Sequence, residues 1–253
     1  LIVFAFIFES EAVKVFRQNI SKISFNMAGV GAFLFFASIL QQFSLLYTNV
    51  ANAAFFTIFY VLFVPIISFF YYSKSIHWSI WPSVLICLGG SYFLSNFTNA
   101  QVRLGDSLVL LGALFWGLHI VFISRVLRLF NFPLSISAIQ CSIVAGFSAI
   151  LALVFETFSL DGIFLEIPEI LYAGLLSSGL AFLLQIYGQR FISPAPIAVI
   201  FSLEGVFATI AAWFLIEQSL ELKQIMGCFL ILTGVLVAQL TPLIASHKSI
   251  ERN

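Results

Sequence analysis

The chain has 253 residues, of which 9% are charged and 61% are hydrophobic, and its mean hydropathy is +1.10. A soluble globular domain carries about 25% charged residues, so this composition excludes a water-soluble enzyme, which could not cover its surface with so few polar groups. The net charge is zero and the basic residues are scattered singly, which excludes a nucleic-acid-binding surface.

In chain order, the apolar run 1–8 is too short to span a bilayer and has no basic leader, so we interpret it as the remainder of a cut helix. A polar stretch from Glu9 to Ser24 follows. Eight apolar runs of near-bilayer length come next, joined by short loops, at 25–47, 50–71, 78–96, 106–126, 134–155, 170–190, 194–216 and 224–244. Because these runs lack period-two polarity, they predict membrane-spanning helices and exclude a porin-type barrel.

The distribution of Lys and Arg predicts the orientation, because basic loops concentrate on the cytoplasmic side. When the loops are assigned alternately to two sides, one side receives only Arg103 and Lys223. The other side receives Lys14, Arg17, Lys22, Lys74, Arg125, Arg128, Arg190, Lys248 and Arg252. We therefore expect a cytoplasmic C-terminus. The acidic loop between 155 and 170 then faces outward, either as a vestibule for cations or simply as a solvated loop.

An internal repeat with an offset of 144 runs without gaps over about 60 residues. Its identical pairs are Ala37 and Ala181, Leu40 and Leu184, Gln41 and Gln185, Ala51 and Ala195, Ala54 and Ala198, Phe63 and Phe207, Ile66 and Ile210, Phe70 and Phe214, and Gly90 and Gly234. Asn49 aligns with Ser193, each at a helix N-cap position, with Pro194 just inside the second helix. Both halves are predicted to make the same tight turn.

The second half begins near Gly105 and contains five spans, an odd number, so matching helices cross the membrane in opposite directions. The predicted fold is an all-α polytopic membrane helix bundle of two inverted five-helix repeats. The offset places the counterpart of Gly105 about 40 residues before Leu1, so we expect ten helices when complete, with the first and part of the second missing. The predicted domains are 1–96 and 105–244, followed by a tail at 245–253.

Several motifs resemble the EamA family of the drug/metabolite transporter superfamily over nearly the whole chain. They are Gly112-Ala113-Leu114-Phe115-Trp116-Gly117, Ser193-Pro194-Ala195, Phe201-Ser202-Leu203-Glu204-Gly205-Val206-Phe207-Ala208, Gly227 and Gly234. The resemblance implies a ten-helix permease of the bacterial inner membrane, in a family thought to export amino acids or other small metabolites. This chain departs from the family in having Gly205 where Pro usually follows the Glu.

Glu204 is the first candidate site residue, because it lies near the middle of its span, where a carboxylate is costly unless it is protonated, paired or facing a polar cavity. It would bind substrate or take up a proton. The alternative is a structural role, in which a protonated Glu204 forms a hydrogen bond across a seam of small residues that includes Ala208 and Ala211. Its repeat counterpart is Tyr60, which is either a hydrogen-bonding group of the cavity or a packing residue.

Four further candidates lie inside predicted spans. The repeat-related Gln41 and Gln185 would offer amide groups to a zwitterionic ligand, or else join helices. His119 and Trp116 share a helix face at a spacing of three, and His119 would join a proton path or be a satisfied histidine of the bundle. Asn52, Gln140 and Tyr187 are weaker candidates.

These features favour a secondary transporter of a small organic metabolite, working by alternating access, with a non-transporting scaffold or accessory subunit as the alternative. The chain has no HExxH motif, no pair of intramembrane aspartates and no phosphate-binding loop, so we expect no enzyme activity. Cys87, Cys141 and Cys228 lie in apolar runs without a CxxC pair, so we expect neither metal nor cofactor. The expected partners are the lipid bilayer and a small-molecule substrate, and a homodimer is left open.

Overall fold

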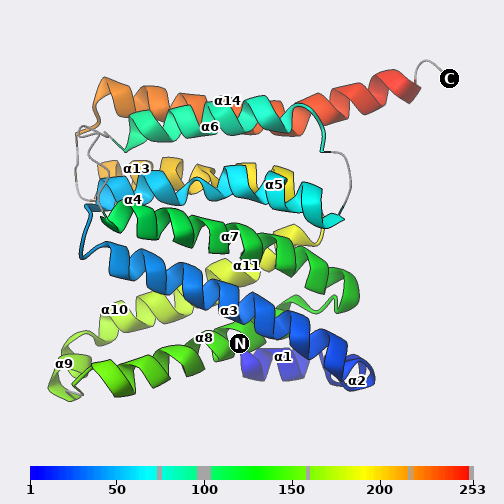
Figure 1. Cartoon of the computed structure of the whole chain (residues 1–253), viewed down its shortest axis with the longest axis vertical. Coiled ribbons are helices and arrows are strands. Elements are labelled where there is room, and N and C mark those ends of the chain that lie inside the picture. Colours follow the sequence, from blue (N-terminus) through cyan, green and yellow to red (C-terminus); the bar gives the residue numbers. More distant parts are fainter. Residues whose placement is uncertain (73–75, 96–103, 158–159, 216, 218, 251–253) are drawn as a thin grey trace. The chain divides into compact units, whose positions relative to one another are not determined.

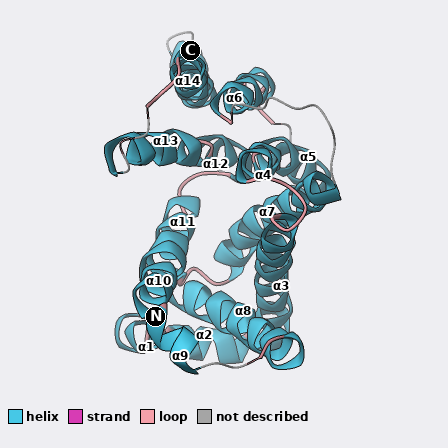
Figure 2. Ribbon diagram, turned by 90° about the vertical axis from the view of Figure 1, so that its left-hand side faces the viewer, coloured by secondary structure: helices cyan, strands magenta, loops and turns pink. Residues whose placement is uncertain are grey.

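A computed structural model of the chain describes residues 1–72, 76–95, 104–157, 160–215, 217 and 219–250 (Figure 1). Every regular element among these residues is a helix (Figure 2). Three basic residues used in the orientation argument, Lys74, Arg103 and Arg252, lie outside the described residues, as does the end of the predicted tail. The rest of the segment predicted as a tail, up to Ile250, belongs to the last helix.

The helices follow one another with short connections. They are α1 (Ile2–Phe8), α2 (Ala12–Gln18), α3 (Ile20–Ser44), α4 (Val50–Thr57), α5 (Tyr60–Tyr72), α6 (Ile80–Leu94), α7 (Leu104–Leu129), α8 (Pro133–Phe155), α9 (Leu160–Leu165), α10 (Ile167–Leu171), the π-helix η1 (Tyr172–Leu180), α11 (Ala181–Gln189), α12 (Pro194–Phe201), α13 (Leu203–Leu215) and α14 (Leu222–Ile250).

Seven helical segments of the described residues are long and apolar enough to cross a membrane. The pairs α4–α5 and α12–α13 each form one such segment, and so does the run from α10 through η1 to α11. The span predicted at 78–96 is shorter than expected: α6 has 15 residues and is about 22 Å long, against about 30 Å for the hydrocarbon core. The prediction of a polytopic helix bundle is confirmed.

The polar stretch predicted from Glu9 to Ser24 is not a loop. It contains α2, and α3 already begins at Ile20. The physical reason is that this stretch is amphipathic: Ala12 and Ile23 are buried in a hydrophobic core, while the charged residues between them stay on the surface. The predicted outer loop between 155 and 170 likewise includes the short helices α9 and α10.

The chain forms two compact units. Unit 1 comprises Leu1–Phe36 and Phe122–Ile192. Its core joins α2, the start of α3, the end of α7, the start of α8 and the end of α11 through Ala12, Ile23, Met27, Val30, Ile123, Val126, Leu127, Phe130, Ile136 and Ile186. The helix ends that meet in this core carry six cationic residues, which are Lys14, Arg17, Lys22, Arg125, Arg128 and Arg190. We call this region the basic end of unit 1.

Unit 2 comprises Ala37–Val121 and Ser193–Asn253. Within it, α6 lies alongside α14, which extends beyond it toward the C-terminus (Figures 1 and 2). Glycines allow this close approach: a Cβ atom on Gly90 would lie 2.7 Å from Ile231 and 2.8 Å from the oxygen of Gly227. A Cβ atom on Gly234 would lie 2.6 Å from Cys87 Sγ and 3.0 Å from the oxygen of Ser83. We call Gly90, Gly227 and Gly234 the glycine seam.

The contacts of the glycine seam obey the repeat offset. Gly90 of α6 approaches Gly227 and Ile231 of α14. The repeat counterpart of Gly90 is Gly234, and it approaches Ser83 and Cys87, which are the counterparts of Gly227 and Ile231. Such reciprocity is the signature of a two-fold axis. Early residues of α6 contact late residues of α14, since Ser83 meets Gly234 whereas Leu94 meets Gly227. The two helices are therefore antiparallel, as the inverted-topology repeat predicts.

Candidate functional site

The breaks between α4 and α5 and between α12 and α13 lie at matching positions of the repeat. Helix α4 ends at Thr57 and α12 ends at Phe201, 144 residues later. Helix α5 packs against α12, and the α4–α5 pair runs in the opposite direction to the α12–α13 pair (Figure 1). Discontinuous helices of this kind form the central sites of many transporters, because their ends carry backbone groups free to meet a ligand.

Hydroxyl side chains lie near the ends of α4 and α12, next to the breaks. Thr57 Oγ1 donates to the oxygen of Ala53 at 2.8 Å, and Ser202 Oγ donates to the oxygen of Val199 at 2.6 Å. Side-chain bonds of this type compete with the helical ladder and bend helices. The backbone then passes through a tighter turn, in which Ser202 N–H also donates to the oxygen of Val199, at 3.2 Å.

Tyr60 and Glu204 meet at these breaks. The Tyr60 hydroxyl donates to Glu204 Oε1 at 3.4 Å, and the two residues are repeat counterparts. Tyr60 is buried at 4% exposure as the first residue of α5, whereas Glu204 is exposed in the first turn of α13. The pair therefore combines a buried hydrogen-bond donor with an accessible carboxylate, which can bind a cationic group or exchange a proton.

The structural alternative for Glu204 required Ala208 and Ala211 to pack against a neighbouring helix. Both alanines are exposed, as are Phe207 and Phe214 on the same side of α13. This side of α13 is therefore not a packed seam among the described residues. A mid-span carboxylate that faced lipid would be costly unless it were protonated or paired, and here the Tyr60 hydroxyl donates to it.

Gln41, Trp116 and His119 form a second cluster in unit 2. Trp116 Nε1 donates to Gln41 Oε1 at 3.2 Å, and the Trp116 and His119 rings meet edge-to-face with centroids 5.9 Å apart. His119 is fully buried. The indole–amide bond joins α3 to α7 where Gly112 lies close to the backbone of Ala37, so the helix-joining interpretation of Gln41 gains support.

Gln185 and Gln41 belong to different units. Gln185 lies half-buried in α11 of unit 1, whereas Gln41 belongs to unit 2. Of the weaker candidates, Gln140 is also in unit 1 and buried, and Tyr187 lies under Arg190, whose guanidinium is 5.6 Å from the ring centroid.

Sequence reasoning missed a buried polar cluster around Asp106. This carboxylate, 1% exposed, accepts hydrogen bonds from Thr48 Oγ1 at 2.5 Å and from Asn52 Nδ2 at 3.4 Å. The adjacent Gly105 is the available sequence signal, because a Cβ atom there would lie 2.7 Å from the backbone of Thr48. The cluster fastens the start of α7 to the turn between α3 and α4, so Asn52 has a structural role.

The predicted helix caps differ between the repeats. Asn49 Oδ1 accepts a hydrogen bond from the Asn52 amide at 2.7 Å, which confirms the first cap. Ser193 has the extended backbone of an N-cap residue and precedes Pro194, but its side chain makes no capping bond. The amide that Asn49 caps belongs to Asn52, and the equivalent residue of the second helix is Pro196, which has no N–H group to donate. Pro194 at the first helical position already has a φ angle that suits a helix.

Comparisons with known proteins agree with this architecture. Residues 103–240 match the model of the EamA-like transporter family. An uncharacterized transporter from Archaeoglobus fulgidus is 34% identical over 212 residues, covering 84% of this chain and 67% of that protein. A solved crystal structure superposes with a TM-score of 0.73 over 90% of this chain and 83% of the other, and its 18% identity supports the fold alone. The chain therefore is an integral membrane protein that belongs to the EamA-like transporter family.

Proposed function

We propose that this protein is a secondary transporter that moves a small organic metabolite, an amino acid or a related compound, by alternating access around Glu204 and Tyr60. The observation that carries the proposal is the meeting of these repeat counterparts at matching helix breaks. A site on the two-fold axis of an inverted repeat is equivalent from both sides of the membrane, which suits a carrier that opens to each side in turn.

In this mechanism, the exposed Glu204 carboxylate binds the ammonium group of the substrate or a coupling proton. The Tyr60 hydroxyl orients the carboxylate from its buried side. His119 and Trp116 lie on α7, and Gln41 on α3, and they contribute polar groups to unit 2.

The orientation also belongs to the proposal. The six cations at the basic end of unit 1 all come from the group of nine assigned to one side by the sequence. Their clustering supports a cytoplasmic location for that end, and with it a cytoplasmic C-terminus in a cell membrane.

Solute counterflow tests the proposal without knowledge of the driving ion. Liposomes containing the full-length protein are preloaded with unlabelled amino acids and metabolites and then exposed to trace labelled counterparts. A carrier should transiently accumulate one label above equilibrium. Glu204→Gln should lower the initial rate by roughly tenfold or more, the equivalent of one charge-assisted hydrogen bond, and should remove any dependence on pH.

Glu221→Gln is the matched control, because it makes the same chemical change at an exposed position that precedes α14. Both variants should elute as folded protein in size-exclusion chromatography. Equal counterflow rates for the two variants would contradict the role of Glu204. Silence of the folded wild-type protein with every pool would contradict the transporter and favour the scaffold or accessory subunit.

A further inference from the structure

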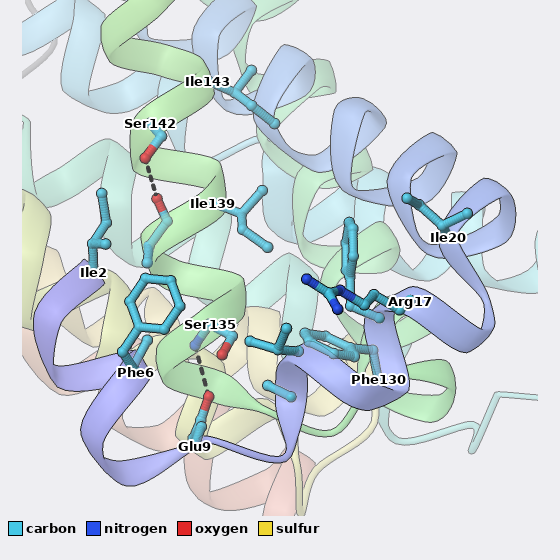
Figure 3. A pocket seen from close by; sticks show the side chains of 15 residues that line it. Ile2, Phe6, Glu9, Arg17, Ile20, Phe130, Ser135, Ile139, Ser142 and Ile143 are labelled. Carbon is cyan, nitrogen blue, oxygen red and sulfur yellow. Dashed lines mark hydrogen bonds between the residues drawn. The ribbon is translucent and has the colours of Figure 1, made fainter.

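Unit 1 contains an apolar cavity that the transport proposal does not use. It has a volume of about 660 Å³ and lies between α1, α2 and α8 (Figure 3). Its walls are mostly aliphatic and aromatic, with Phe6, Phe16, Phe130, Ile139 and Ile143 among the lining residues. Water is a poor occupant, because an apolar cavity offers it few hydrogen-bond partners. A volume of this size is typical of sites that hold an organic ligand.

Two charged residues line this cavity, and only one of them is available to a ligand. Glu9 accepts hydrogen bonds from the amides of Leu134 at 3.0 Å and Ser135 at 2.8 Å, so its carboxylate serves the N-terminus of α8. Arg17 lines the cavity from α2, is exposed, and makes no ion pair with any residue that the structure describes. In Figure 3 the Arg17 side chain lies beside Phe130, on the opposite side of the cavity from Ile2.

The surroundings of the cavity add positive charge. Ala12, Phe16 and Phe130 line it and also belong to, or pack against, the core at the basic end of unit 1. The six cations gathered there outnumber the nearby acidic residues of the chain, Glu9 and Glu11, and Glu9 is already engaged by α8. This end of unit 1 therefore complements an anionic ligand.

We propose that the cavity holds an acyl chain of an anionic phospholipid whose phosphate pairs with Arg17. The bilayer supplies acyl chains, and an acyl chain in this mostly apolar cavity gains dispersion contacts with its walls. A lipid tail gains little from leaving other tails, so selectivity comes from the headgroup and its pairing with basic residues. The site is distinct from the Glu204 and Tyr60 pair, which belongs to unit 2.

Native mass spectrometry of the purified full-length protein tests this site. The probes are phosphatidylglycerol and phosphatidylcholine with the same acyl chains, each titrated into delipidated protein. The wild-type protein should bind phosphatidylglycerol more tightly. Arg17→Gln should lower that affinity about fivefold and leave phosphatidylcholine binding unchanged, because one basic residue near the surface contributes about that factor.

Two further variants locate the lipid. Lys223→Gln removes an equivalent exposed charge in unit 2 and should bind both lipids like the wild type. Ser142→Phe places a ring on the cavity wall and should weaken the binding of both lipids.

Three outcomes would overturn the proposal. The first is that Arg17→Gln and Lys223→Gln bind phosphatidylglycerol equally well. The second is that Ser142→Phe binds both lipids like the wild type. The third is that the wild-type protein binds neither lipid because another protein segment fills the cavity. Transport by the wild-type protein is measured separately, so failure of the lipid site and failure of the transport mechanism are distinguishable.

Discussion

The glycine seam between α6 and α14 makes a quantitative prediction about a single methyl group. In Gly227→Ala the new Cβ would lie 2.6 Å from the oxygen of Gly90 and 2.8 Å from the nitrogen of Leu94. Both atoms belong to the backbone of α6, so the clash cannot be relieved by a side-chain rotation. The two helices must move apart along the seam.

Gly89→Ala is the matched control, because it is next to Gly90 on α6 and a Cβ there meets nothing within 4 Å. Both changes gain helix propensity of about 1 kcal/mol, since glycine is that much less favourable than alanine in a helix interior. Only Gly227→Ala bears the overpacking cost of about 1–3 kcal/mol. Subtracting the shared gain leaves Gly227→Ala less stable than Gly89→Ala by about 1–3 kcal/mol.

Thermal unfolding of the full-length protein in detergent, followed by tryptophan fluorescence, measures the difference. At about 2–4 °C per kcal/mol for a chain of this size, Gly227→Ala should melt roughly 2–12 °C below Gly89→Ala. Both scans need the same heating rate, because membrane proteins often unfold irreversibly. If the two variants melted within about 1 °C of each other, the close antiparallel contact and the two-fold relation inferred from it would be refuted.

Three other substitutions test contacts outside the seam. Asp106→Ala leaves two buried side-chain donors without their acceptor and should lower the free energy of unfolding by about 1–3 kcal/mol; an unchanged melting temperature would contradict the cluster. Trp116→Phe should cost about 0.5–1.5 kcal/mol and be coupled to Gln41→Leu in a double-mutant cycle, whereas strict additivity would disprove the indole–amide bond. Glu9→Ala should cost about 0.5–2 kcal/mol and speed hydrogen exchange in the first turn of α8, and the cap would be dismissed if that exchange stayed unchanged.

Several properties of the protein follow from the sequence by itself. Hydropathy is a local property, so the runs of apolar residues were enough to predict the membrane helices. The offset of 144 was visible in the alignment of the chain with itself, and an odd number of spans per repeat already required inversion. The cap at Asn49 was predictable for the same reason, because its partner is only three residues away.

Other properties depend on contacts between residues far apart in the chain, and only the tertiary structure decided them. The repeat made Tyr60 and Glu204 equivalent, but equivalence does not imply contact; they touch because the fold brings both beside the two-fold axis that relates them. The partners of Asp106 could not be predicted from the sequence, because the close approach at Gly105 is what brings Thr48 and Asn52 to it. Likewise, the polar composition of 9–24 concealed α2, whose stability comes from burying one apolar face in a core to which α7, α8 and α11, more than 100 residues away, contribute.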